Sequence, residues 1–150
     1  MRIAVSSDER TGVADAVVEA LRARGHEVIA HGALADGERV DWAWASEAAA
    51  RDVAEGTADQ AIVCCWTGTG ASIAANKVRG VRAALCGDAR TAQGARQWND
   101  ANVLALSLRT TSAALMEEIL DAWLAATPSP DEGDRANIGH LGEIERHGTT

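Results

Sequence analysis

The sequence predicts a three-layer, doubly wound α/β domain built on a five-stranded parallel sheet. Short apolar runs alternate with helical stretches of roughly 10–15 residues, which is the pattern of βαβ units. The run at residues 61–65 is apolar throughout and β-branched in part, as in a strand buried on both faces of a parallel sheet. Strands alternating with helices of this length form a parallel sheet covered on both sides.

The strands are short and end at polar or glycine-containing turns. Residues 1–5 are followed by Ser6, Ser7 and Asp8, and residues 26–31 follow a glycine and form an edge strand. We expect strands at residues 1–5, 26–31, 61–65, 81–86 and 103–107.

The helices are predicted by apolar spacing and by the residues at their ends. Val13, Val17 and Leu21 recur at i, i+4 and i+8 on one helix face. Gly25 is a typical stop, and Asp41 is a typical N-cap. We expect helices at residues 11–24, 41–55, 71–77, 88–98 and 112–126.

The sequence becomes polar and proline-containing after residue 126. Residues 1–126 are therefore expected to form the domain, and residues 127–150 a linker and helical extension. Residues 127–133 carry two prolines and read as a linker. Residues 135–147 place Ile138, Leu141 and Ile144 near helical spacing. A single amphipathic helix must bury its apolar stripe, so we expect it to pack on a partner subunit. Folding back on its own domain remains open.

Composition excludes several classes of protein. The net charge of −8, without any basic stripe, argues against nucleic-acid binding, which depends on neutralising phosphates. No apolar run approaches the roughly 18–20 residues of a membrane helix, and the N-terminus does not resemble a signal peptide, so a cytoplasmic protein is expected. The three cysteines include no CxxC pair, so neither a zinc site nor a redox pair is indicated.

Residues 61–77 are the strongest candidate for a functional site. A thiol, Cys65, ends the buried strand, and a turn containing Gly68 and Gly70 leads into the helix over residues 71–77. The free amides at a helix N-terminus attract anions and favour a thiolate beside them. The structural alternative is that Cys65 is only a small buried apolar residue.

Polar residues follow two other strands of the predicted sheet. Asp8 and Glu9 follow the first strand, and Arg109 follows the fifth. Because ligands bind outside the carboxyl ends of the strands in such sheets, these residues are expected to meet Cys65 there.

The run CWTGTGASIAANKV at residues 65–78 resembles the signature of the type B ribose-5-phosphate isomerases. That family includes the galactose-6-phosphate isomerase subunits. The likeness continues through residues 80–86, 99–106 and 119–124, and in all it covers about residues 1–125.

The resemblance implies a cofactor-free aldose–ketose isomerase of a sugar phosphate. It implies a homodimer with its sites at the subunit interface, and two such dimers could form a tetramer. It assigns catalysis to Cys65 as the base, with Thr67 and Asp8 beside it, and we add Glu9, which follows Asp8, as a catalytic candidate. The substrate-binding residues that it implies are Trp42, Trp66, Gly68, Thr69, Gly70, Ala71, Trp98, Asn99, Arg109 and Arg135.

The sequence departs from the family pattern at several of these positions. Glu9 and Trp98 stand where the family has histidines, Trp66 replaces a glycine, and Trp42 replaces a tyrosine-like residue. A C-terminal arginine cluster is reduced to Arg135. Indole cannot act as a general acid, although its face stacks well on sugars. We therefore expect an altered substrate, either an open-chain sugar phosphate or a less anionic sugar derivative, with Glu9 replacing a lost histidine as the acid.

Two other functions remain open. A non-catalytic sugar or sugar-phosphate binding protein on the same fold would explain the lost histidines. A nucleotide-binding flavodoxin-like module is disfavoured, because Ile73 occupies the third position of the dinucleotide glycine pattern.

Overall fold

The computed structural model describes residues 1–148 and contains a five-stranded, all-parallel sheet. The strands are β1 (Arg2–Ser7), β2 (Glu27–Gly32), β3 (Gln60–Cys65), β4 (Ala83–Leu85) and β5 (Val103–Ser107). The helices are α1 (Ala14–Ala23), α2 (Trp42–Ala54), α3 (Thr69–Asn76), α4 (Ala89–Asn99), α5 (Ala113–Ala125) and α6 (Glu132–His147). The predicted α/β class is confirmed.

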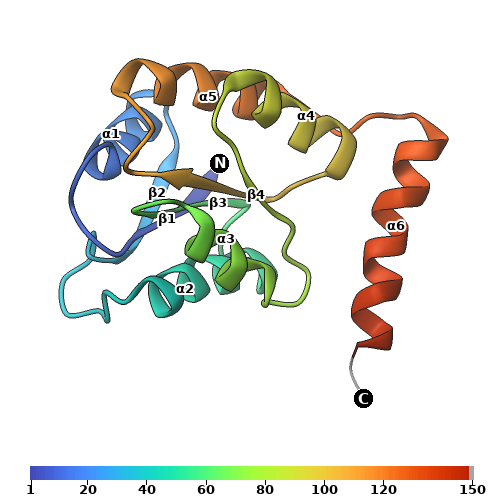
Figure 1. Cartoon of the computed structure of the whole chain (residues 1–150), viewed down its shortest axis with the longest axis horizontal. Coiled ribbons are helices and arrows are strands. Elements are labelled where there is room, and N and C mark those ends of the chain that lie inside the picture. The colour runs from blue at the N-terminus through green and yellow to red at the C-terminus, as the bar shows by residue number, and fades with distance from the viewer. Residues whose placement is uncertain (149–150) are drawn as a thin grey trace.

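The sheet order is β2-β1-β3-β5-β4, so β3 lies at its centre and β2 at an edge, as expected. Helices α1, α4 and α5 cover one face of the sheet, and α2 and α3 cover the other (Figure 1). This is the three-layer arrangement that the sequence predicts.

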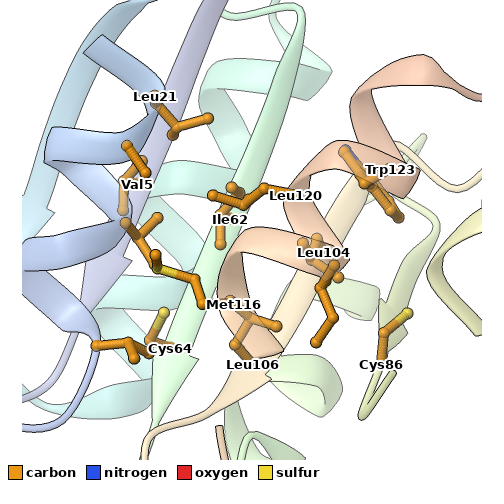
Figure 2. Close-up of a cluster of buried hydrophobic side chains, with 14 of the residues drawn as sticks. Val5, Leu21, Ile62, Cys64, Cys86, Leu104, Leu106, Met116, Leu120 and Trp123 are labelled. Carbon is orange, nitrogen blue, oxygen red and sulfur yellow. The ribbon is translucent and has the colours of Figure 1, made fainter. Parts of the chain in front are cut away.

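The two faces of the sheet are packed with side chains of different size. The face under α1, α4 and α5 buries large residues, including Leu104, Met116 and Trp123 (Figure 2). The indole N–H of Trp123 donates to Gln60 Oε1 at 2.8 Å, which satisfies its polar atom inside the core. The face under α2 and α3 is packed mostly by alanines and valines, together with Cys65.

The register of the three central strands brings their carboxyl ends together. Ser7 pairs with Cys64 across β1 and β3, and Cys65 pairs with Ser107 across β3 and β5. The chain segments that follow β1, β3 and β5 therefore leave the same edge of the sheet side by side.

Several element boundaries differ from the sequence prediction. Strand β4 is only three residues long, because the side chains of Asn76 and Asn102 replace ladder hydrogen bonds at its start. Helix α1 begins three residues later than expected, after Gly12 with its φ of 55°. Asp41 is the N-cap residue of α2, but its carboxylate binds Arg39 and caps no amide.

Helix α6 begins at Glu132, three residues before its predicted start, and stands at the side of the domain (Figure 1). It has no fully buried residue, and it packs against α4. Glu145 Oε1 also accepts the Gly80 amide at 2.9 Å, so the helix touches its own domain near both ends. Its predicted contact with a partner subunit stays a prediction.

Candidate active site

The turn between β3 and α3 places the Cys65 thiol at a helix N-terminus. The Ala71 amide donates to Cys65 Sγ at 3.4 Å, and the residue is 5% exposed. An amide directed at sulfur stabilises negative charge there, and the dipole of α3 acts in the same direction. The sequence places this helix start at Ala71, but α3 begins at Thr69, so Gly70 lies within its first turn.

Gly68 makes this turn possible for two separate reasons. Its φ of 76° lies in the left-handed region, which other residues rarely adopt. A Cβ at this position would lie 2.5 Å from Leu85 Cδ1 and 2.9 Å from the Leu106 carbonyl carbon. The turn is therefore pressed against β4 and β5 and holds the Cys65 thiol in place.

The first two amides of α3 remain available for a ligand. The amides of Thr69 and Gly70 donate to no acceptor within residues 1–148. Beside them the hydroxyls of Thr67 and Thr69 are hydrogen-bonded to each other at 2.8 Å, and both residues are exposed. The turn thus presents donors beside a nucleophilic sulfur.

The adjacent cysteine has a different environment. Cys64 faces the large-residue core and is 1% exposed (Figure 2). Burial, with smaller effects from Cys65 and Asp8, raises its pKa to about 12. The two cysteines point to opposite faces of the sheet, as the period of a strand requires, and Cys64 is a core residue.

The end of β5 fixes the backbone next to Cys65. The carbonyl of Trp66 accepts the Arg109 amide at 2.9 Å and the Ser107 hydroxyl at 3.0 Å. The Trp66 side chain is 52% exposed. Arg109 is also exposed, and its guanidinium makes no ion pair within the described chain. An unpaired cation thus follows the strand beside the Cys65 turn, where the sequence places it.

Two carboxylates follow the end of β1. The Ser7 hydroxyl donates to the Glu9 carbonyl at 2.6 Å, which turns the chain at Asp8. Asp8 Oδ1 is buried and has no partner in the described chain. Burial, followed by the nearby Glu9 charge, raises the pKa of Asp8 above its usual value. Asp8 therefore takes up a proton more readily than an exposed carboxylate.

The indole of Trp42 lies against the same turn. A Cβ on Gly70 would stand 2.9 Å from Trp42 Cε3 and 3.1 Å from Cδ2. The ring remains 46% exposed. The start of α2 thus brings an aromatic surface to the first turn of α3, close to the two free amides.

Comparison with known proteins decides the family. The profile of the family described as Ribose/Galactose Isomerase matches residues 3–140. The ribose-5-phosphate isomerase B structure from Clostridium thermocellum has a TM-score of 0.90 and 38% identity, covering 99% of this chain and 100% of that one. This chain belongs to the ribose/galactose isomerase family.

Two relatives act on other sugars. A galactose-6-phosphate isomerase subunit of Clostridium acetobutylicum is 39% identical over 128 residues, covering 85% of this chain and 73% of that protein. A D-erythrulose-4-phosphate isomerase of Pectobacterium atrosepticum is 46% identical over 77 residues, covering 51% of each chain. The present protein is an isomerase, and its relatives differ in the sugar that they convert.

Three of the predicted site residues lie apart from Cys65 within one chain of this isomerase. Trp98 and Asn99 end α4, shortly before β5 starts at Val103 opposite Ala61. That is the amino end of the strands, about 13 Å along β3 from Cys65 at roughly 3.3 Å per residue. Arg135 lies on α6, and other residues of that helix line a pocket together with Trp98 and Asn99 that includes no residue of the Cys65 turn.

His31 has a role that the sequence did not indicate. Its side chain is only 15% exposed. Its Nε2 lies 2.6 Å from Asp52 Oδ2, and its Nδ1 lies 3.1 Å from Glu38 Oε2. His31 thus ties the segment before Trp42 to α2. No local pattern links it to Asp52, which lies 21 residues away.

Two further searches of the described residues give limited results. No helix within residues 1–148 is long and apolar enough to cross a membrane. The same part of the chain holds no group of three or more His, Cys, Asp and Glu side chains placed to bind a metal ion.

Proposed function

We propose that this isomerase interconverts the aldose and ketose forms of a sugar phosphate, with Cys65 as the catalytic base. The observation that carries the proposal is the hydrogen bond from the Ala71 amide to Cys65 Sγ at the N-terminus of α3. It supports a thiolate at the one cysteine of the chain that lies at a ligand-accessible turn.

The reaction needs a proton to move between adjacent carbons. The Cys65 thiolate takes the proton from the carbon next to the carbonyl, and the electron pair of that C–H bond forms the double bond of an enediolate. The carbonyl electron pair moves to oxygen. The hydroxyl on the carbon that lost its proton then becomes the new carbonyl, and its proton passes to the former carbonyl oxygen. Cys65 returns the first proton to the former carbonyl carbon, which completes the isomerisation. A positioned base of this kind contributes about 10²–10⁴-fold in rate.

The enediolate oxygen carries the charge that must be stabilised. The amides of Thr69 and Gly70 are free donors fixed by the start of α3, and they are suited to hold this oxygen. Thr67 is a close hydroxyl partner. Asp8 and Glu9 are suited to exchange protons with the sugar oxygens, because burial already raises the pKa of Asp8. Arg109 supplies an unpaired cation for the phosphate.

The substrate that we propose is one that cannot close into a ring. Opening a sugar ring requires an acid–base group, and Trp98 stands where the family has the histidine assigned to that step. A tetrulose 4-phosphate stays open because its chain is too short to form a five-membered ring, and the corresponding aldose stays open because its terminal oxygen is esterified. One relative is named as an isomerase of D-erythrulose 4-phosphate, which supports a four-carbon ketose phosphate as the first candidate.

We also propose that two copies of the chain complete each site. Trp98, Asn99 and Arg135 lie far from Cys65 in one chain, so they reach a substrate at the Cys65 turn only from a second copy. Helix α6 has no buried residue of its own and is available to such a partner. Mixing Cys65→Ala with Asn99→Ala tests this arrangement. Regained activity that neither variant has alone supports a shared site, and no recovery contradicts it.

Deuterium uptake at the carbon next to the carbonyl tests the proposed reaction. The panel comprises four-, five- and six-carbon sugar phosphates, with Cys65→Ala as the control. We expect cysteine-dependent exchange that is fastest with the four-carbon ketose phosphate. Exchange that persists in Cys65→Ala would exclude this cysteine as the base.

The competing function is sugar-phosphate binding without turnover. It is favoured by the indole of Trp98 in place of a histidine. The same panel separates the two functions: ligand-dependent tryptophan fluorescence without any exchange would replace the isomerase by a binding protein.

A further inference from the structure

The aromatic surface at the start of α2 has a role that the proposed reaction does not require. Trp42 is the first residue of α2, and its six-membered ring covers Gly70. Three ring atoms would lie within 2.9–3.2 Å of a Cβ at Gly70, so only glycine admits the ring at this distance. This contact joins two segments that are 28 residues apart in the chain.

The ring lies beside the groups that would hold the reacting end of a substrate. The Gly70 amide is one of the two free amides of α3, and the next amide, that of Ala71, is bonded to Cys65. A sugar whose carbonyl oxygen meets the Gly70 amide therefore starts next to the indole. The Trp42 ring occupies the space between this amide and α2. It therefore limits the length of the sugar that fits beside Cys65.

The start of α2, which carries the ring, is anchored by the segment that precedes it. Glu38 accepts the Gly32 amide at 2.9 Å and also bonds His31, which in turn bonds Asp52 on α2. These contacts close the segment between β2 and α2 on both sides. The backbone at the start of α2, which carries Trp42, is therefore tied to the end of β2.

We propose that Trp42 is the specificity-determining residue that limits the chain length of the sugar phosphate. The inference rests on the proposed isomerase function and deepens it. The exposed part of the indole contacts the carbon chain of the substrate, and its bulk favours short substrates over five- and six-carbon ones. When the indole is removed by substitution, the site admits longer sugar chains, and Cys65 itself is unchanged.

Trp44 provides a matched control on the same helix. Its side chain is 49% exposed, close to the 46% of Trp42. It lies under the Arg39 guanidinium, 3.5 Å from the ring centroid, whereas Trp42 lies against the active turn. Both are therefore exposed indoles in the first turn of α2, and only one of them contacts Gly70.

The experiment compares kcat/KM for four-, five- and six-carbon sugar phosphates in the wild type and in the variants Trp42→Ala, Trp42→Tyr and Trp44→Ala. We expect Trp42→Ala to raise the ratio of six- to four-carbon activity by about tenfold or more, since filling or emptying part of a pocket changes selectivity by roughly 10–200-fold. For Trp42→Tyr, this ratio should lie between those of the wild type and Trp42→Ala. Trp44→Ala should keep the wild-type ratio.

Three outcomes contradict the inference. In the first, Trp42→Ala lowers kcat/KM equally for all chain lengths, which would make the ring a packing residue only. In the second, Trp44→Ala shifts the ratio as much as Trp42→Ala. In the third, the wild type converts no substrate of the panel, which overturns the proposed function together with the inference. Wild-type turnover with an unchanged ratio overturns the inference alone.

Discussion

The two faces of the sheet are built from side chains of different size, and each face serves a different purpose. The face under α1, α4 and α5 buries Leu104, Leu106, Met116 and Trp123. The face under α2 and α3 buries mostly alanine and valine. Large apolar side chains contribute most to stability through the area that they remove from water. Small ones bring helices close to the sheet.

The close approach of α2 and α3 is what assembles the candidate site. Ala49 and Ala50 on α2 and Ala71 and Ala75 on α3 are all fully buried. With such small residues beneath them, the start of α3 reaches Cys65 and the start of α2 reaches Gly70. One face of the sheet therefore stabilises the fold, and the other positions the chemistry.

The largest expected effect is a difference in turnover between variants of the neighbouring cysteines, which point to opposite faces of the sheet. Cys65→Ala should lower turnover by about 10²–10⁴-fold, the usual contribution of a positioned base. Cys64→Ala should keep turnover and destabilise the fold by roughly 1 kcal/mol, as typical core changes do. Steady-state kinetics and urea unfolding of both variants measure the two effects.

Thiol labelling provides an independent check of the same comparison. Burial raises the pKa of Cys64 to about 12 and that of Cys86 to about 11, so neither supplies much thiolate at neutral pH. Iodoacetamide should therefore modify Cys65 first, as read by mass spectrometry. Equal labelling of Cys64 and Cys65 would contradict the separation of the two faces.

The second prediction changes packing on each face in turn. Leu104→Ala on the large-residue face should cost about 2–5 kcal/mol of unfolding free energy without altering kcat/KM in the folded protein. Ala49→Val on the small-residue face should cost about 1–3 kcal/mol through overpacking, and it should also lower kcat/KM, because α2 packs on α3, whose start holds Cys65. Denaturant unfolding and kinetics on the same samples test both halves. An unchanged kcat/KM in Ala49→Val would show that α2 does not position the site.

The sequence predicts the features of this comparison that depend on local periodicity. The alternation of a strand places Cys64 and Cys65 on opposite faces, and glycine after the apolar run predicts the turn. The alternating strands and helices predict the parallel sheet. Each of these properties is determined by neighbouring residues.

Features that depend on contacts between distant segments could not be predicted in the same way. The contact of Trp42 with Gly70 and that of His31 with Asp52 leave no local pattern. The distance of Trp98 from Cys65 follows from the strand register, because α4 runs back along the sheet and ends at the start of β5. The short β4 depends on side-chain hydrogen bonds from Asn102, which lies beyond α4.

The third prediction tests the turn that links β3 to α3. Gly68→Ala should destabilise the fold by more than the roughly 1–2 kcal/mol of a left-handed backbone alone, since its Cβ would also meet Leu85. Gly25→Ala is the matched control, with a φ of 84° and no atom within 4 Å of its Cβ. The midpoint of thermal unfolding should therefore be lower for Gly68→Ala than for Gly25→Ala. Only Gly68→Ala should slow the labelling of Cys65. Equal losses of stability would mean that Leu85 moves aside without cost.

The smallest expected effect concerns the carboxylate next to the site. Burial, and then the Glu9 charge, raises the pKa of Asp8 above its usual, unfolded-state value. The folded state consequently holds more protons than the unfolded state between these two pKa values. Stability falls as pH rises through that window. Asp8→Asn should remove this loss, so its stability relative to the wild type should be greater at pH 7 than at low pH.

Asp88 gives the opposite sign and serves as the control for this pH effect. It caps α4 by accepting the Thr91 amide at 2.7 Å, which lowers its pKa. Its stabilising effect is present above the unfolded pKa and is lost as pH falls through the lower, folded pKa. Urea unfolding between pH 3 and 7 measures the free energy of unfolding of each protein. As pH rises, the wild type should become more stable relative to Asp88→Asn and less stable relative to Asp8→Asn. A parallel response of the two variants would mean that the Asp8 carboxylate is solvated and does not share the desolvated environment of the site.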